Sequence, residues 1–431
     1  MIKYIALGAM LIMAFQTPLA AADKLLQPSD LVYLGAFRVP QGELGGPQYH
    51  GLTYGGSAIA YNPAHNSLFI TGTDSDQLVA EISIAEPTNT SNISSMKTAT
   101  VLQNLADITE GNLTHIKAGG AAETDNQVKI GGLIVYGNKL IGTAYSYYDG
   151  AQTAVLTHFT SGLTLSTSGD FRGIYQVGSS PSVPQAGFIA GYMGNIPSSY
   201  QSALGGPVLS GQAALSILGR TSWGPSAFSF DPSRLGVDNP VAARPLVYYP
   251  IDHQTLAVWD HNTPANPYMS LGDQITGIAF PSGTRTIFFS GQHGLGASCY
   301  GVGGATDPGN HSGVDYCYDP SNDSKGSHAY PYTNYIWAYD VNDFVAVNNG
   351  SKNPWDIRPY AVFALSFPTV QSNFTVLNGA AAYDEASKKL YIVQVGSDVV
   401  GYDMLPPIHV FRVNTGSDST APSPPAGLRT H

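Results

Sequence analysis

The chain has 431 residues, of which 48 are Gly, 29 are Pro, 26 are Tyr and only 11% are charged. Nineteen Lys plus Arg against thirty Asp plus Glu give a net charge of −11, with no basic stripe of the kind that phosphate binding needs. We therefore expect no nucleic-acid partner. Many Gly and aromatic residues with few helix-favouring charged residues predict short strands joined by turns.

Residues 1–22 have the pattern of a signal peptide. Lys3 precedes an apolar run over residues 5–15, and Pro18 and a run of three alanines follow it. The apolar run is shorter than the roughly 20 residues of a spanning helix, although a membrane anchor is the alternative interpretation. We expect cleavage before Asp23, a secreted or periplasmic protein, no membrane span and a monomer.

Several segments repeat one pattern, in which small residues lead to an aromatic residue, a turn and a second apolar strand. Each one is typical of a β-hairpin. Aligned on the aromatic residue, five copies and a weaker sixth place these residues in equivalent positions: Tyr61, Tyr136, Phe230, Phe280, Tyr383 and, in the weaker copy, Tyr192.

An imperfect all-β repeat of this size resembles a β-propeller, in which each blade is a short antiparallel sheet. The resemblance implies a single propeller domain over residues 23–413 with about six to seven blades. It also implies that the apolar strands at residues 31–39 and 408–413 pair to close the ring. A β-sandwich array is the alternative architecture.

Residues 414–431 read NTGSDSTAPSPPAGLRTH, a Ser/Thr/Pro/Gly-rich composition that is typical of a linker. The segment also resembles the linker into a fibronectin type III module. We expect residues 414–431 to form a disordered tail.

The longest predicted loop, residues 292–334, contains both cysteines of the chain. It lies between apolar strands at 286–291 and 335–340. In an oxidising compartment Cys299 and Cys317 are expected to form a disulfide, which contributes roughly 3 kcal/mol to the local loop. Five tyrosines and the predicted disulfide argue against disorder. We expect a recognition loop over one face of the propeller, with a purely structural flap as the alternative.

Candidate proton carriers in this loop are two histidines and a tyrosine, because such side chains exchange protons near neutral pH or at activated positions. They are His293, His328 and Tyr330. Candidate sugar-binding residues are chosen because aromatic faces pack against sugar C–H surfaces while polar tips hydrogen-bond. They are Tyr300, Tyr332, Tyr147, Trp259 and His261. Surface hydrogen bonding for the histidines and core packing for the aromatics are the plainer interpretations.

Asp319 and Asp323 precede Gly326 with a spacing that partly imitates a calcium loop. The glycine comes two residues late and no closing Glu follows, so a solvated Asx turn is the preferred interpretation. Calcium is the one cofactor that the pattern would allow, and no other is predicted.

Secreted propellers include polysaccharide lyases that use Tyr and His as proton carriers. The resemblance implies an extracellular carbohydrate-active protein whose partner is a polysaccharide or cell-surface glycan, with a lyase-type or glycoside-cleaving enzyme as one form of it. The alternative is a non-catalytic glycan- or surface-binding propeller, and the sequence leaves that choice open. The sequence contains no G-x-S-x-G elbow, P-loop or C-x-x-C-H motif, which excludes common serine hydrolases, nucleotide-binding enzymes and c-type haem proteins.

Overall fold

The computed structural model describes residues 23–124, 128–178, 186–212, 220–258, 260–311, 313–366 and 378–416. The predicted signal peptide at residues 1–22 and all but the first three residues of the predicted tail lie outside this part of the chain. Within it, none of the helices combines the length and the apolar character needed to cross a membrane.

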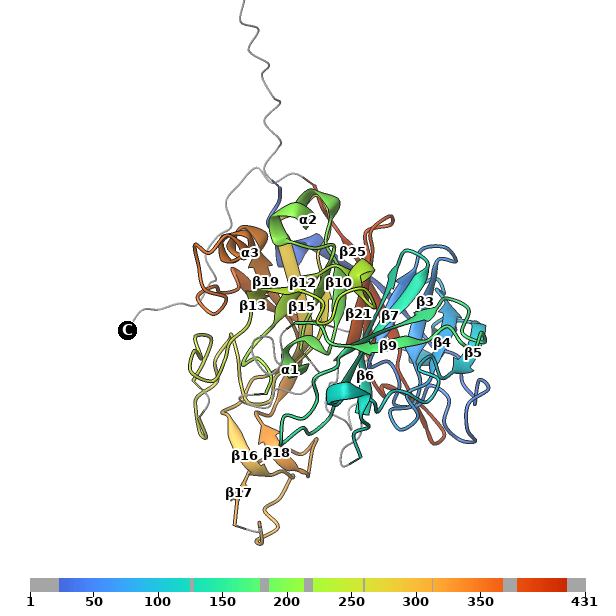
Figure 1. Ribbon diagram of the computed structural model, residues 1–431. Helices are drawn as coiled ribbons and strands as arrows, with labels where there is room; N and C mark the ends of the chain where they lie inside the picture. The colour runs from blue at the N-terminus through green and yellow to red at the C-terminus, as the bar shows by residue number, and fades with distance from the viewer. Residues whose placement is uncertain are drawn as a thin grey trace, which may run out of the picture.

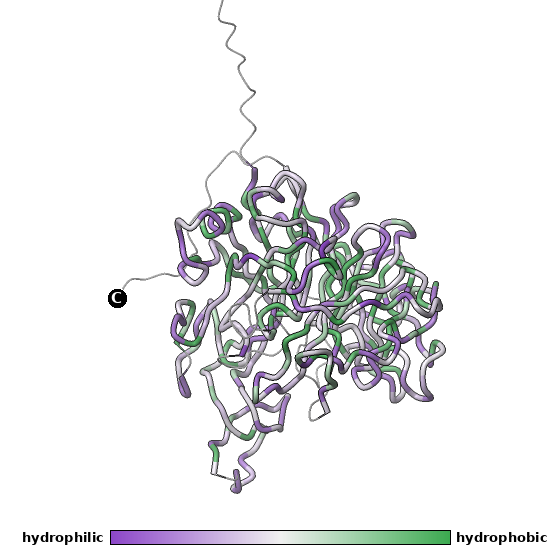
Figure 2. The backbone as a smooth tube through the Cα atoms, in the orientation of Figure 1, coloured by the Kyte–Doolittle hydropathy of each residue, from purple (hydrophilic) through white to green (hydrophobic). Residues whose placement is uncertain are grey.

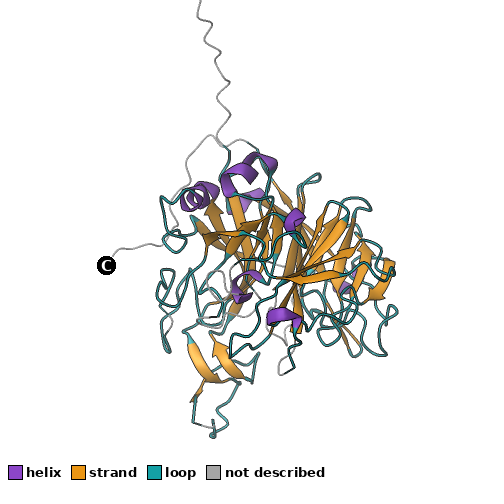
Figure 3. Cartoon of the chain, viewed as in Figure 1, coloured by secondary structure: helices purple, strands orange, loops and turns teal. Residues whose placement is uncertain are grey.

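The protein is all-β, as predicted, and its helices are short (Figure 3). The α-helices are α1 (Ala186–Ile189), α2 (Ser198–Leu204) and α3 (Val341–Asn348). Single 3-10 turns lie at Pro28–Asp30, Ile93–Ser95, Ala118–Gly120 and Pro232–Arg234.

The described residues form five four-stranded antiparallel sheets, which we number I to V. Sheet I contains β2 (Ile59–Asn62), β3 (Ser67–Thr71), β4 (Val79–Ser83) and β5 (Val101–Ala106). Sheet II contains β6 (Val128–Tyr136), β7 (Lys139–Ser146), β8 (His158–Gly162) and β9 (Arg172–Tyr175). Sheet III contains β10 (Met193–Asn195), β11 (Val208–Ser210), β12 (Ala227–Phe230) and β13 (Ala243–Val247).

The two remaining four-stranded sheets come from the C-terminal half and from the first strand of the chain. Sheet IV contains β14 (Gln274–Ala279), β15 (Thr286–Gly294), β19 (Tyr332–Asp340) and β20 (Ala361–Leu365). Sheet V contains β21 (Asn378–Asp384), β22 (Lys389–Gln394), β25 (Ile408–Val413) and β1 (Leu31–Phe37). Smaller sheets are made by β16 (Cys299–Val302), β17 (Asp315–Tyr316) and β18 (Lys325–His328), and by β23 (Asp398–Val400) and β24 (Asp403–Leu405).

The first strands of sheets I to V contact one another in chain order, and the first strand of sheet V returns to that of sheet I. The strand β1 completes sheet V by pairing with β25, with Leu31 opposite Val413. The predicted pairing of the first and last strands is therefore confirmed. This cyclic order of sheets is consistent with the predicted propeller class.

The described residues contain five such sheets, whereas the repeats suggested about six to seven blades. The reason lies in sheet III, which two of the aligned copies share. Tyr192 directly precedes β10, the first strand of that sheet, whereas Phe230 ends β12, its third strand. The two copies therefore belong to one sheet of the described residues.

The core lies between neighbouring sheets. One cluster joins sheets III and IV through buried aromatic residues that include Tyr249, Phe289, Trp337 and Tyr339. Glycines allow the closest approaches: a Cβ on Gly131 would lie 2.1 Å from the carbonyl oxygen of Ala190. In Figure 2 hydrophobic colour is common along the central strands and purple is common in the peripheral loops.

The connections gather at two ends of the sheets. The ends of the five first strands converge on a cavity of about 530 Å³, which is lined by residues that include Tyr61, Val135, Ile196, Phe280 and Tyr383. We call this end the hairpin face, because the hairpins between first and second strands lie here. The opposite end carries the connections between second and third strands (72–78, 147–157, 295–331 and 395–407) and those that lead into first strands, such as 38–58. We call it the loop face.

Figure 1 shows this polarity: β16, β17 and β18 project at the bottom of the view, and α2 and α3 lie at the top. The helix α2 connects β10 to β11, and α3 connects β19 to β20, so both belong to the hairpin face.

Candidate functional site

Exposed tyrosines gather on the loop face. Seven tyrosines among the described residues are classed as exposed, and each lies in a connection of this face. They are Tyr49, Tyr54, Tyr147, Tyr148, Tyr300, Tyr318 and Tyr402. Tyr402 is fully exposed and Tyr49 is 79% exposed. Apolar rings that cluster on one surface mark an interaction site.

Two consecutive tyrosines, Tyr147 and Tyr148, follow β7 and each covers a cation. The ammonium of Lys129 lies 5.2 Å from the ring centre of Tyr147. The guanidinium carbon of Arg220 lies 4.6 Å from the ring centre of Tyr148. Both distances are within the range of a cation–π contact, which holds the rings in place on the surface.

A turn at residues 73–77 brings ionisable groups to the same region. The amide oxygen of Gln77 accepts a 2.6 Å hydrogen bond from the backbone of Ile130, which fixes the turn to the first strand of sheet II. Asp74 in this turn forms an ion pair with Lys129. Asp76 lies 2.6 Å from Nδ1 of His50, whose side chain is 38% exposed.

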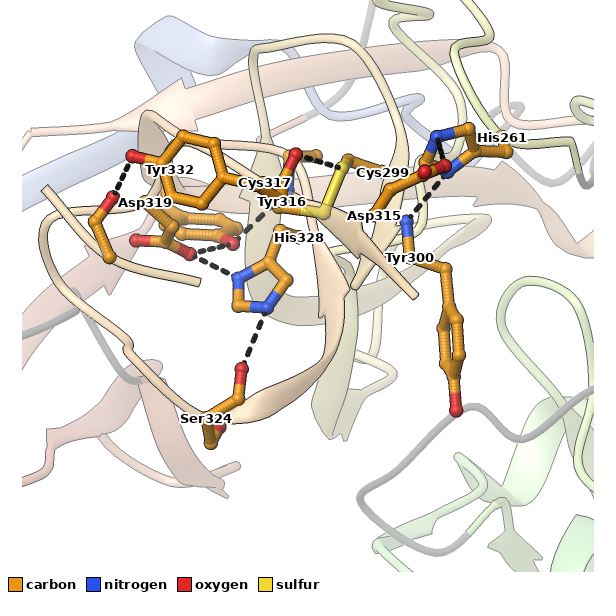
Figure 4. The surroundings of a disulfide bond; sticks show 12 residues. His261, Cys299, Tyr300, Asp315, Tyr316, Cys317, Asp319, Ser324, His328 and Tyr332 are labelled. Atoms are coloured by element: carbon orange, nitrogen blue, oxygen red, sulfur yellow. Dashed lines mark hydrogen bonds and ion pairs between the residues drawn. A yellow bond between two sulfur atoms is a disulfide. The ribbon is translucent and has the colours of Figure 1, made fainter. Parts of the chain in front are cut away.

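The insertion at residues 295–331 is held by the predicted disulfide. Cys299 and Cys317 are bonded, with a Cα–Cα distance of 5.8 Å (Figure 4). The strand β16 pairs with β17 and β18, and Cys299 lies opposite His328. The predicted bounds of 292–334 need correction, because β15 continues to Gly294 and β19 already begins at Tyr332.

His328 is buried and both of its ring nitrogens are engaged (Figure 4). Nδ1 lies 2.8 Å from Asp319 Oδ2, and Nε2 lies 3.1 Å from the carbonyl oxygen of Ser324. A carbonyl oxygen can only accept, so Nε2 carries a hydrogen and donates it. The carboxylate of Asp319 occupies the other side of the ring, so both nitrogens of His328 face oxygens of the insertion.

The surroundings of Asp319 favour its ionised form. Burial raises the pKa of this carboxyl, but hydrogen bonds from His328, Ser321 and Tyr332 outweigh burial and bring the pKa below its usual range. The hydroxyl of Tyr332 donates to Asp319 at 2.7 Å, and burial raises the pKa of that hydroxyl. The predicted sugar-binding residue Tyr332 is thus part of the internal bonding of the insertion.

His293 lies in β15 of sheet IV, outside the insertion. It is buried, its Nδ1 is 2.9 Å from each carboxylate oxygen of Asp273, and its ring stacks on Tyr335 at 4.4 Å. These two candidate proton carriers, His293 and His328, are therefore each bonded to a different carboxylate. Tyr330 is half-buried and makes edge contacts with the rings of Tyr318 and Tyr332.

His261 connects the insertion to the loop that leads into sheet IV. Its Nδ1 accepts a 3.0 Å hydrogen bond from the backbone of Tyr300, and its Nε2 lies 2.7 Å from Asp315 (Figure 4). With both nitrogens engaged, this residue positions Tyr300, whose own ring is exposed. Trp259, the remaining predicted binding residue, lies outside the described residues.

The aspartates considered for calcium have different surroundings. Both oxygens of Asp319 accept hydrogen bonds, from Ser321 on one side and from His328 and Tyr332 on the other. Asp323 is exposed. No group of three or more His, Cys, Asp or Glu side chains suited to a metal ion occurs in the part of the chain that the structure describes.

Sequence reasoning missed the pairs at the turn 73–77 and the role of Arg220. The partners His50 and Asp76 are 26 positions apart and belong to different connections, so no local spacing signals their contact. The run of four charged or polar residues DSDQ, which begins three positions after the end of β3, was the only available hint.

No protein-family model and no curated protein sequence matches the chain. Solved structures are similar at low identity. A glycosyl hydrolase from Bacteroides ovatus is 10% identical, with 92% of this chain and 95% of that chain covered and a TM-score of 0.38. A luciferin-regenerating enzyme is 9% identical, with 85% and 93% covered and a TM-score of 0.35. A putative oxidoreductase (glucose dehydrogenase) from Thermus thermophilus is 11% identical, with 85% and 98% covered and a TM-score of 0.33.

Proposed function

We propose that this protein is an exported, monomeric five-bladed β-propeller that binds a polysaccharide or cell-surface glycan on its loop face. One observation carries the proposal: the exposed tyrosines of the described residues all belong to this face. Export agrees with the disulfide, since such bonds persist in oxidising compartments.

Tyrosine suits a sugar ligand because its ring packs against C–H groups while its hydroxyl bonds to water or to sugar hydroxyls. Rings that are already held in place lose little conformational entropy on binding. Tyr147 and Tyr148 meet this condition through their contacts with Lys129 and Arg220. At Tyr300 the bond to His261 fixes the backbone, and the ring is exposed. The insertion thus supplies one wall of the binding face and the loop after β7 supplies another.

Turnover of the bound glycan is a second candidate function, and the His50–Asp76 pair favours it. The carboxylate of Asp76 orients the partly exposed ring through Nδ1, which leaves Nε2 to exchange a proton. His328 and His293 are less suited to that role, because both are buried and bonded to carboxylates. Their surroundings fit a structural role for both histidines.

A polysaccharide panel separates the two candidates. Purified protein is run through native gels that contain one polysaccharide each, and the same mixtures are assayed for new reducing ends and for absorbance of unsaturated uronates. Retardation without product supports binding alone, and product supports turnover. Neither retardation nor product on any polysaccharide would refute the proposed function.

If product forms, His50→Gln should abolish it while retardation persists, since the substitution removes the proton carrier and leaves the tyrosines in place. His115→Gln is the matched control, because His115 is also in a loop but bonds to Asn112. Product formation that survives in His50→Gln would exclude His50 as the proton carrier.

A further inference from the structure

The cavity at the hairpin face has apolar and aromatic walls. Each of the five first strands contributes apolar lining residues, among them Ile59, Leu133, Met193, Ile278 and Ala381. Aromatic rings from three different sheets also line it, and they are Tyr61, Phe280 and Tyr383. With a volume of about 530 Å³ the cavity has the size of a binding site, and its apolar walls favour an occupant that removes them from water.

The charge around this cavity is acidic. Among the lining residues, Asp384 and Glu385 are the two that carry a charge. Glu385 forms an ion pair with Lys388. The carboxylate of Asp384 accepts a 2.9 Å hydrogen bond from the backbone of Ala386 and one from the hydroxyl of Ser387, and it has no cationic partner among the described residues. An occupant with one positive charge would therefore balance the cavity.

The chain passes beside this cavity after its last strand. The backbone nitrogen of Asn414 donates a 2.8 Å hydrogen bond to the carbonyl oxygen of Asp30. The carbonyl oxygen of Thr415 would lie 3.9 Å from a Cβ on Gly283. Gly283 directly follows the lining residue Ser282 in the hairpin between β14 and β15. Residues 417–431 thus start next to the rim, and in an extended form they reach roughly 45 Å at about 3.1 Å per residue.

The sequence of residues 417–431 suits the cavity. Pro422, Pro424 and Pro425 form a P-x-x-P pattern, which favours the polyproline II conformation. Such segments bind in aromatic-lined grooves, because they are already extended and lose little conformational entropy on binding. Leu428 adds an apolar side chain and Arg429 adds a positive charge. Composition alone predicts a disordered tail, whereas the cavity offers these residues a complementary surface.

We propose that residues 417–431 dock into the cavity of the hairpin face, with their prolines against its aromatic rings and Arg429 toward the carboxylate of Asp384. The docked segment closes this end of the ring of sheets. Docking is independent of glycan binding, since the loop face lies at the opposite end. The tether at Thr415 gives the segment an effective concentration on the order of millimolar, so a modest intrinsic affinity is enough.

Photo-cross-linking in the full-length chain tests where the segment binds. The photoreactive amino acid p-benzoylphenylalanine is placed at position 426, which keeps the three prolines, and mass spectrometry identifies the cross-linked peptides after irradiation. We expect cross-links to the lining segments 59–63, 193–198, 278–282 or 381–386. A mixture of isotopically light and heavy chains shows whether each cross-link lies within one molecule.

A competition experiment tests whether the prolines and the arginine hold the segment in place. A full-length variant combines Pro422→Ala, Pro424→Ala, Pro425→Ala and Arg429→Gln, and a fluorescent peptide of residues 417–431 is titrated by anisotropy. The variant should bind the peptide at least about tenfold more tightly than the unmodified chain, because its own segment no longer competes.

Tyr61→Ala in the same variant should weaken peptide binding about fivefold through the lost aromatic contact. Tyr136→Ala is the matched control, because Tyr136 is the aligned tyrosine of sheet II and is not a lining residue. If Tyr61→Ala loses its thermal transition, the cross-link map decides. Cross-links to the loop face, cross-links between molecules, or no cross-links would each overturn the proposal. Equal peptide affinity of the variant and the unmodified chain would overturn it as well.

Discussion

The insertion and the turn at 73–77 contain the same kinds of side chains in opposite environments. Each places a histidine against an aspartate and has tyrosines nearby. In the insertion, His328 and Asp319 are buried and their polar atoms are engaged within the loop. Beside the turn, His50 and Asp76 are partly exposed, and Nδ1 is the one imidazole nitrogen that bonds to another described residue.

This difference shows that accessibility decides what a histidine–aspartate pair does. A buried pair that satisfies its own hydrogen bonds stabilises a loop, whereas a partly exposed pair can exchange protons with a ligand. The predictions below test whether the insertion is stabilised internally and whether the smaller loops carry recognition.

The largest expected effect is on the insertion in His328→Ala. The substitution leaves the buried carboxylate of Asp319 without one of its hydrogen-bond donors, and breaking such a buried pair costs about 3–5 kcal/mol. Hydrogen exchange with mass spectrometry should show faster exchange over 299–328, and the global melting temperature should change little because the sheets keep their own cores. His311→Ala is the control, since its pair with Asp307 is in the same insertion but is more exposed. Equal effects of both substitutions would contradict a special role for the buried pair.

A slightly smaller effect is expected when Cys299→Ala is combined with Cys317→Ala. Loss of the disulfide should destabilise the insertion by roughly 3 kcal/mol through the greater entropy of its open form. Protease nicking within 300–316 should accelerate, with little change in the global melting temperature. A large fall in that temperature would mean that the disulfide stabilises the ring of sheets as well.

Each exposed tyrosine ring in the smaller loops should contribute about 1 kcal/mol to the free energy of glycan binding. Tyr147→Ala should weaken retardation by a glycan about fivefold, because the packing surface for the sugar is lost. Tyr147→Phe should retain most of the affinity, and direct titration of the same glycan measures both. If Tyr147→Ala binds as well as the unmodified protein, recognition lies elsewhere on the loop face.

The smallest expected effect is a loss of stability of the insertion at low pH. The pKa of Asp319 is below its usual range, mainly because its hydrogen bonds overcome the effect of burial. A carboxyl whose folded pKa is depressed contributes stability above the unfolded pKa, near 4, and this contribution disappears as the pH falls through the folded value. Exchange over 299–328 at matched intrinsic rates should therefore increase below about pH 4. Asp319→Asn should lack this dependence, and an unchanged dependence would assign it to other groups.

The sequence predicted the fold class because repeated hairpins are local patterns. Four of the five full copies are the first two strands of a sheet, and the apolar ends at 31–39 and 408–413 indicated their pairing. The blade number was less accessible, because the first strand of sheet III has only three residues and its third strand has a similar pattern. An alignment of repeats easily misplaces a short first strand such as β10 when another strand of the same sheet, here β12, matches the pattern better.

For the site, the sequence predicted the disulfide, and two of its candidate binding residues, Tyr147 and Tyr300, are exposed. Cysteine pairing follows from count and compartment, whereas burial of a histidine depends on distant partners. Nothing near His328 in the sequence distinguishes an internally bonded histidine from an exposed proton carrier.

The pairing of β1 with β25 has a consequence for how the chain folds during synthesis. Sheet V needs residues from both ends of the domain, so β1 leaves the ribosome long before its partner strand exists. Until then its backbone groups and its apolar sequence LVYLGAF remain available for wrong pairing. Closing the ring is a contact of very high sequence separation, which folds slowly. A chaperone that holds the chain extended would prevent such wrong pairing until the last strand has been made.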